Sequence, residues 1–133
     1  MGSQIHLEET LIIGKAAAFQ SNSPKTSFAV VFEDDSETAY VYALDTSCAE
    51  KPILDALHIY NVSSVADREK PSMLQVAWSD DGLKAVVVIN RYPHAVFDFE
   101  AHRGYCRTNS PAPDTSWTSH SHEWNDAAIG LFR

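Results

Sequence analysis

Cysteine is scarce in this sequence: Cys48 and Cys106 are the only two in 133 residues. A single pair is too few for the disulfide frameworks that hold small secreted domains together. A chain of this length buries about two-thirds of its unfolded surface, so one hydrophobic core can stabilise it without disulfides or metal. We therefore expect reduced thiols, a cytoplasmic location and a single domain over residues 1–133.

Long apolar runs are also missing. Leu11–Ile13 is interrupted by Gly14 and Lys15, and no segment approaches the roughly 20 apolar residues of a membrane span. The first ten residues contain no Lys or Arg, which argues against a secretory signal. The sequence therefore predicts no membrane partner.

Positive charge is in short supply. Ten Lys and Arg stand against 18 Asp and Glu, which gives a net charge of −8. The excess lies in the first hundred residues, because the remainder carries as many bases as acids. Such a surface repels phosphate backbones and attracts cationic surfaces. We therefore expect no nucleic-acid partner, and a basic protein as the favoured kind of partner.

Signatures of catalysis and of cofactor binding are absent. The sequence contains neither the Gly-x-Ser-x-Gly elbow of hydrolases nor the glycine-rich loops that hold phosphates. His120-x-His122 has a spacing that two zinc ligands can use, but no Cys-x-x-Cys or His-Glu-x-x-His motif accompanies it. A solvated loop is the simpler interpretation. The sequence favours a protein that is not an enzyme, and we assign no cofactor, no metal ligand and no catalytic residue. Whether His120 and His122 bind a metal ion stays open.

The sequence does have a series of short β-type runs separated by turn residues. Alternating residues rich in Val, Tyr and Phe are typical of half-buried strands, and Asp81-Gly82 between two such runs indicates a hairpin. Strands are predicted at 27–34, 38–44, 53–62, 73–79, 83–90 and 94–101, with a further candidate at 11–20 and a short edge strand at 105–107.

The end of the chain is the one place with helical periodicity. Trp124, Ala127, Ala128 and Leu131 recur at i, i+3, i+4 and i+7, which predicts a helix over residues 123–132. An antiparallel sheet with one apolar face needs a cover, and this helix can supply it. The predicted fold is therefore α+β: an antiparallel, meander-like sheet of six or seven strands, paired largely between sequence neighbours and covered by a C-terminal helix. Trp124 should be largely buried against the sheet.

A candidate binding site lies on the predicted strand 94–101. Alternation places His94, Asp98 and Glu100 on the face that points away from the core. Two carboxylates beside an imidazole are suited to acid–base work. The alternative is that these residues lie on the solvent-exposed face of a half-buried strand, where charged side chains are common without any function.

Two further residues complete the candidate site. Cys106 precedes Arg107, whose charge favours a thiolate, although a structural thiol at a strand end is the alternative. Trp117 is suited to anchoring a partner, because tryptophan is enriched at interface hot spots. The predicted binding residues are His94, Asp98, Glu100, Cys106 and Trp117.

Four segments together resemble one family of bacterial proteins. They are SFAVVFEDDSETAYVYAL (27–44), ILDALHIYNV (53–62), AWSDDGLKAVVVINRYPHAVFDF (77–99) and GYCR (104–107). The resemblance covers about residues 10–132 and is to a small, uncharacterised bacterial domain family of this length. No activity is assigned to that family, so the resemblance implies no catalytic residue.

These observations favour a binding or interaction protein. By analogy of size and charge, it could be an immunity protein that neutralises a basic toxin through electrostatic attraction. The acidic run 33–37 and the outward face of strand 94–101 would carry the charge. A homodimer formed through an exposed edge near 104–108 is another form of interaction. The alternative function is a small ligand-binding module or enzyme with a pocket near His94, Asp98, Glu100 and Cys106.

Overall fold

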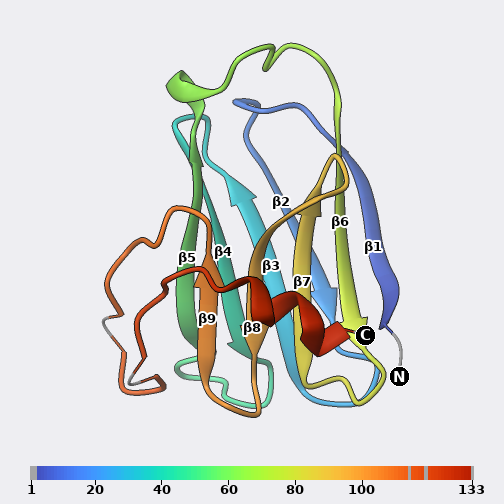
Figure 1. Cartoon of the computed structure of the whole chain (residues 1–133), viewed down its shortest axis with the longest axis vertical. Coiled ribbons are helices and arrows are strands. Elements are labelled where there is room, and N and C mark those ends of the chain that lie inside the picture. Colours follow the sequence, from blue (N-terminus) through green and yellow to red (C-terminus); the bar gives the residue numbers. More distant parts are fainter. Residues whose placement is uncertain (1–2, 114, 119, 133) are drawn as a thin grey trace.

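Two antiparallel β-sheets face each other in the computed structural model, which describes residues 3–113, 115–118 and 120–132 (Figure 1). The four-stranded sheet has the order β2-β3-β4-β5, and the five-stranded sheet has the order β1-β6-β7-β8-β9. The elements are β1 (Ser3–Leu11), β2 (Ala17–Asn22), β3 (Phe28–Asp34), β4 (Thr38–Asp45), β5 (Ile53–Asn61), β6 (Ser72–Ser79), β7 (Lys84–Ile89), β8 (Tyr92–Asp98) and β9 (Arg103–Cys106), with short 3-10 helices at Val62–Ser64 (η1) and Asp126–Phe132 (η2).

Period-two alternation decides which side chains each strand buries. In β4, Val41 and Ala43 are buried between the sheets, while Tyr42 lies half-buried on the outer face. In β7, Val87 faces the space between the sheets and Val86 faces outward, yet both are buried. The five-stranded sheet is therefore covered on both faces at β7, whereas the outer face of the four-stranded sheet is partly exposed to solvent.

One hydrophobic core fills the space between the sheets. Phe32 and Leu57 from the four-stranded sheet meet Trp78 and Phe97 from the five-stranded sheet, and none of the four is more than 1% exposed. Phe99 packs among them, with ring centroids 5.7 Å from Trp78 and 5.9 Å from Phe97. Each such side chain contributes about 1.5–3 kcal/mol when fully buried, so this core is the main source of stability.

The predicted α+β fold is wrong, because the protein is a β-sandwich. Six strands do form close to the predicted positions, and most pair with their sequence neighbours. They do not form one meander, however. Residues 62–71 cross over one end of the molecule, so β6 pairs with β1 rather than with β5 (Figure 1). Each sheet thus covers the apolar face of the other, and no helix is needed for that role.

The predicted C-terminal helix over residues 123–132 is also wrong. Only Asp126–Phe132 is helical, and it is a 3-10 helix. Gly130 lowers the helical propensity of this short segment, and so few residues do not form a stable α-helix in water. The segment lies on the outer face of the five-stranded sheet, where Ala128 is buried and Trp124 is only partly buried. Neither helical segment of the described chain has the length and hydropathy to cross a membrane.

The first part of the chain differs from the prediction as well. The candidate strand 11–20 is interrupted by a turn at Gly14, whose φ of +93° suits glycine. β1 ends at Leu11 and β2 begins at Ala17, and the two strands belong to different sheets. The sequence reasoning missed β1 because it is an edge strand with mostly exposed side chains, so it lacks an apolar run.

Candidate functional site

The predicted face of β8 exists, but its middle is covered. His94, Val96 and Asp98 point to the outer side of the five-stranded sheet, and Phe97 points into the core, as alternation predicted. Val96 is fully buried in a cluster with Ala128 of the C-terminal segment. His94 and Asp98 therefore lie at the two ends of a covered strip.

The two carboxylates of the predicted site are engaged separately. Asp98 is buried, and its Oδ1 accepts hydrogen bonds from the backbone N–H groups of Glu100 (3.1 Å) and Ala101 (3.0 Å). Glu100 is exposed and pairs with the ammonium of Lys84 at 3.0 Å. Asp98 thus shapes the turn after β8, and Glu100 neutralises a neighbouring base.

His94 lies beside a stack of aromatic and cationic groups. Its ring meets the edge of Tyr92 at a centroid distance of 5.2 Å. The guanidinium of Arg107 lies between two rings, 4.4 Å from the centroid of Tyr92 and 3.9 Å from that of Trp124. Burial, with a smaller contribution from the charge of Arg107, lowers the pKa of His94. The lowered pKa favours the neutral form of His94, and Arg107 joins Trp124 of the C-terminal segment to Tyr92 of the sheet.

Cys106 and Trp117 lie elsewhere. Cys106 is fully buried in the main core, and its thiol donates a hydrogen bond to the carbonyl oxygen of Ser110 at 3.3 Å. Trp117 stacks on His102 with centroids 4.9 Å apart and touches the edge of Phe99 at 5.9 Å. The five predicted side chains are thus distributed over the outer face, a turn, the core and the rim of the core.

The histidine pair separates into one buried and one exposed residue. His122 is 2% exposed, and its Nε2 lies 2.9 Å from both carboxylate oxygens of Asp55. Its Nδ1 contacts the carbonyl oxygen of Pro111. Both ring nitrogens therefore face oxygen acceptors, while His120 is exposed two residues away. Among the described residues, no three His, Cys, Asp or Glu side chains form a group that could hold a metal ion.

Sequence reasoning missed Asp55, although a signal for it exists. Asp55 shares the core-facing side of β5 with Leu57 and Ile59, and it is 1% exposed. A carboxylate at a core position needs a buried partner, because an unpaired buried charge is costly. The sequence therefore indicated that Asp55 needs a buried partner, although it did not identify His122 among the later His, Lys and Arg residues.

The edge near residues 104–108 is partly occupied by the chain's own C-terminal segment. The N–H of Cys106 donates to the carbonyl oxygen of His122 at 3.1 Å, and Cys106 forms a parallel bridge with Glu123. The Thr108 hydroxyl donates to the carbonyl oxygen of His58 at 2.8 Å, which joins this segment to β5. The homodimer through this edge stays a prediction.

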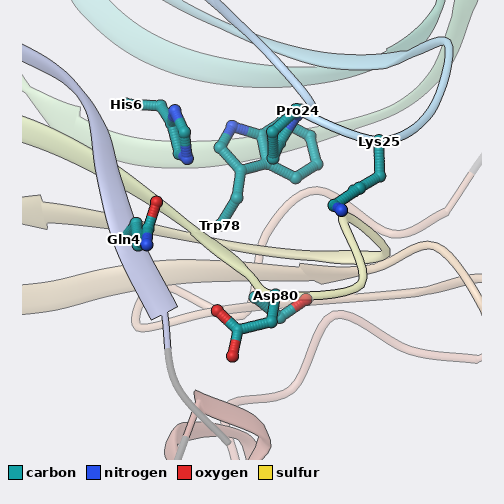
Figure 2. A pocket seen from close by; sticks show the side chains of 7 residues that line it. Gln4, His6, Pro24, Lys25, Trp78 and Asp80 are labelled. Atoms are coloured by element: carbon teal, nitrogen blue, oxygen red, sulfur yellow. The ribbon is translucent and has the colours of Figure 1, made fainter.

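A pocket of about 440 Å³ opens at one end of the sandwich, which we call the end pocket (Figure 2). Gln4 and His6 come from β1, Pro24 and Lys25 from the loop between β2 and β3, and Asp80 from the turn after β6. Trp78 lies between them in Figure 2. None of the predicted site residues lines this pocket; its lining is Gln4, His6, Pro24, Lys25, Trp78, Ser79 and Asp80.

A second feature covers the outer side of the four-stranded sheet. We call it the acidic aromatic face and define it by Glu33, Tyr40, Tyr42 and His58. In the strand register Glu33 pairs with Tyr40, and Tyr40 pairs with His58. Tyr40 stacks on Tyr42 with centroids 6.2 Å apart and meets the His58 ring edge-on at 5.4 Å. The tyrosines are half-buried, so their rings are held in place and remain accessible.

The acidic run at the tip of this face divides into two kinds of carboxylate. Asp34 is buried and accepts hydrogen bonds from the hydroxyl of Tyr60 (2.6 Å) and the N–H of Gly14 (2.8 Å). Asp35 accepts from backbone N–H groups of its own turn, which lowers its pKa. Glu33 and Glu37 are exposed at the same tip. Burial, and then the nearby Glu33, raises the pKa of Tyr42, so its phenol stays protonated.

The two packed sheets and these surfaces define a small β-sandwich protein. Residues 11–133 match the family model DUF2251, described as an uncharacterised protein conserved in bacteria, and the chain belongs to that family. An uncharacterised protein of Haemophilus influenzae is 43% identical over 115 residues, which covers 84% of this chain and 71% of the relative. No solved structure matches the chain.

Proposed function

We propose that the protein binds a basic partner protein through the acidic aromatic face, and that it does so in the cytoplasm. One observation carries this proposal: the four strands of the sheet that bears this face contain no Lys or Arg. The bases within strands, Lys84 and Arg103, belong to the five-stranded sheet. Within the strands, the four-stranded sheet carries four acids and no base, whereas the five-stranded sheet carries three acids and two bases.

The chemistry of the face suits lysine and arginine side chains. Tyrosine rings attract cations through their π faces, and a phenol that stays protonated also donates a hydrogen bond. Glu33 supplies a carboxylate beside those rings, and Glu37 supplies an exposed carboxylate in the turn at the tip. Tyrosine is enriched among residues that dominate binding energy, and acidic surfaces accelerate association with basic partners. The combination favours a cationic protein surface over an apolar one.

Neutralisation of a basic toxin is the specific form of this function that we favour. A small acidic protein that meets a basic enzyme gains speed and selectivity from electrostatic attraction. Both cysteines are free thiols, Cys48 exposed and Cys106 buried, which agrees with a reducing compartment. Glu100 is neutralised by Lys84 and Asp98 shapes a turn, so the proposed contact rests on the acidic aromatic face.

The experiment measures binding to the products of the neighbouring genes in the source bacterium. Each product is purified and titrated calorimetrically against this protein at two salt concentrations. We expect one basic product to bind, with an affinity that falls as salt increases. Tyr40→Ala should weaken binding by about thirtyfold, and Glu33→Lys by about tenfold or more.

Matched controls lie on the other side of the molecule. Tyr92→Ala removes a tyrosine that is 51% exposed on the five-stranded sheet, and Glu9→Lys reverses an exposed charge on β1 of the same sheet. Both should bind as the unmodified chain does. The proposal fails if no basic product binds, or if the control variants weaken binding as much as Tyr40→Ala and Glu33→Lys.

A further inference from the structure

The end pocket is assembled from three separate parts of the chain. β1, the β2–β3 loop and the β6–β7 turn meet at the end of the sandwich where β1 begins (Figures 1 and 2). In Figure 2, Gln4 and His6 lie to one side of Trp78, Pro24 and Lys25 lie to the other, and Asp80 lies below. None of these residues belongs to the acidic aromatic face, so the pocket is a separate site.

The chain's own hydrogen bonds hold the walls of the end pocket in place. The hydroxyls of Ser23 and Thr26 in the β2–β3 loop both donate to the carbonyl oxygen of Gly82 in the β6–β7 turn, at 2.9 and 3.3 Å. The indole N–H of Trp78 donates to the hydroxyl of Ser21 at 3.0 Å. A ligand therefore meets a preformed pocket and does not have to order the loops that line it.

Gly82 shows how closely the two loops fit. Its φ is +71°, and a Cβ atom at this position would lie 2.4 Å from the hydroxyl oxygen of Ser23 and 2.7 Å from the Cβ of Lys25. A larger residue at position 82 would push the β2–β3 loop outward. The backbone and Cβ of Lys25 are therefore held beside the turn that carries Asp80.

We propose that the end pocket binds a small zwitterion with a carboxylate and an ammonium group, of which an α-amino acid is the simplest. The ammonium of Lys25 and the imidazole of His6 supply donors for the carboxylate. Asp80 supplies an acceptor for the ammonium, because a carboxylate has about four lone-pair sites and can accept a further donor beside its existing interactions. Pro24 supplies exposed apolar surface for the rest of the ligand, beside the buried ring of Trp78.

The opposite charges in the pocket select against molecules that carry only one charge. A simple carboxylate would meet Lys25 and His6 but also the carboxylate of Asp80. A simple amine would meet Asp80 but also the ammonium of Lys25. A volume of about 440 Å³ lies in the usual range of small-molecule pockets, about 300–1,000 Å³, and it accommodates an amino acid.

Nuclear magnetic resonance of the full chain tests this proposal directly. The indole N–H signal of Trp78 is followed while the natural amino acids are added one at a time. We expect at least one to shift this signal in a saturable way at millimolar concentration. The amino acid that binds best is then compared with two analogues, one without the ammonium group and one without the carboxylate. For leucine these analogues are isocaproate and isoamylamine. Each analogue should bind at least about tenfold more weakly than the amino acid.

Two lysine variants separate this site from general charge effects. Lys25→Gln removes the charge and keeps a shorter polar side chain, and it should weaken binding about tenfold or more. Lys51→Gln removes an exposed charge outside the pocket and should leave binding unchanged. The proposal is overturned if no amino acid shifts the Trp78 signal, if an analogue with one charge binds as well, or if the two variants behave alike. These outcomes leave the proposed partner binding through the acidic aromatic face unaffected.

Discussion

Asp55 and His122 form the one salt bridge that is buried on both sides among the described residues. Each side chain is 1% exposed, and they are 67 positions apart in the chain. Their bond joins β5 to the segment that precedes η2. Gly104 lies against Asp55, since a Cβ atom there would stand 3.0 Å from Oδ2 of Asp55. The pair therefore fixes how the C-terminal segment lies on the sandwich.

Removing one partner of this pair should destabilise the fold strongly. His122→Ala leaves the carboxyl group of Asp55 buried with only the N–H of Ala56 as a donor in the described part of the chain, and a buried polar group that loses a partner costs about 1–3 kcal/mol, more when it is charged. Chemical denaturation measures the change in the free energy of unfolding. His120→Ala, two residues away and exposed, is the matched control and should change it by less than about 0.5 kcal/mol. Equal effects of the two variants would contradict the role assigned to the pair.

His94 should make stability depend on pH. Its pKa is lowered in the folded protein, so below its ordinary value of 6.5 the unfolded chain binds more protons at this residue than the folded chain does. The contribution of His94 is therefore present above pH 6.5 and is lost as pH falls through the lowered pKa. His94→Gln should lose this part of the pH dependence. Unfolding is measured for both proteins from about pH 8 to pH 5, and a difference that does not change with pH would refute the assignment.

Strand elements were predictable from the sequence where apolar alternation is strong. β3, β4 and β7 were located by runs of Val, Phe and Tyr, since these runs depend only on local periodicity. β1 was missed because its side chains are mostly exposed. The predicted C-terminal helix was wrong because apolar spacing over ten residues does not distinguish an α-helix from a packed 3-10 segment. The distribution of strands between two sheets could not be predicted, because it depends on the crossing after β5.

The 3-10 segment should be dispensable for folding, because the main core lies between the two sheets. A chain that ends at Glu123 keeps His122 and loses η2, which exposes Ala77, Val86 and Val96 on the outer face. We expect this chain to melt cooperatively at a lower temperature and to bind a hydrophobic dye more strongly than the full chain. Circular dichroism in the near ultraviolet checks the packing. Loss of a cooperative transition would show that the outer cluster is part of the main core.

At the scale of the whole molecule, the charge could be predicted but its placement could not. The net charge and the acidic run 33–37 are visible in the sequence, and they led to the expectation of a basic partner. Which side of a sandwich faces solvent depends on the pairing of the sheets, so the acidic aromatic face could not be located beforehand. The end pocket depends in the same way on three distant segments, and its residues carry no motif.

The central claim is that a basic partner covers the outer side of the four-stranded sheet. Hydroxyl-radical footprinting of the protein, alone and with the basic product that binds it, tests this claim most directly. We expect oxidation of Tyr40 and Tyr42 to fall by at least about tenfold in the complex, since a tightly bound interface excludes water from its centre. Tyr92, 51% exposed on the opposite sheet, should be oxidised equally in both samples. If Tyr92 is protected while oxidation of Tyr40 and Tyr42 is unchanged, the partner binds the five-stranded sheet, which would contradict the account.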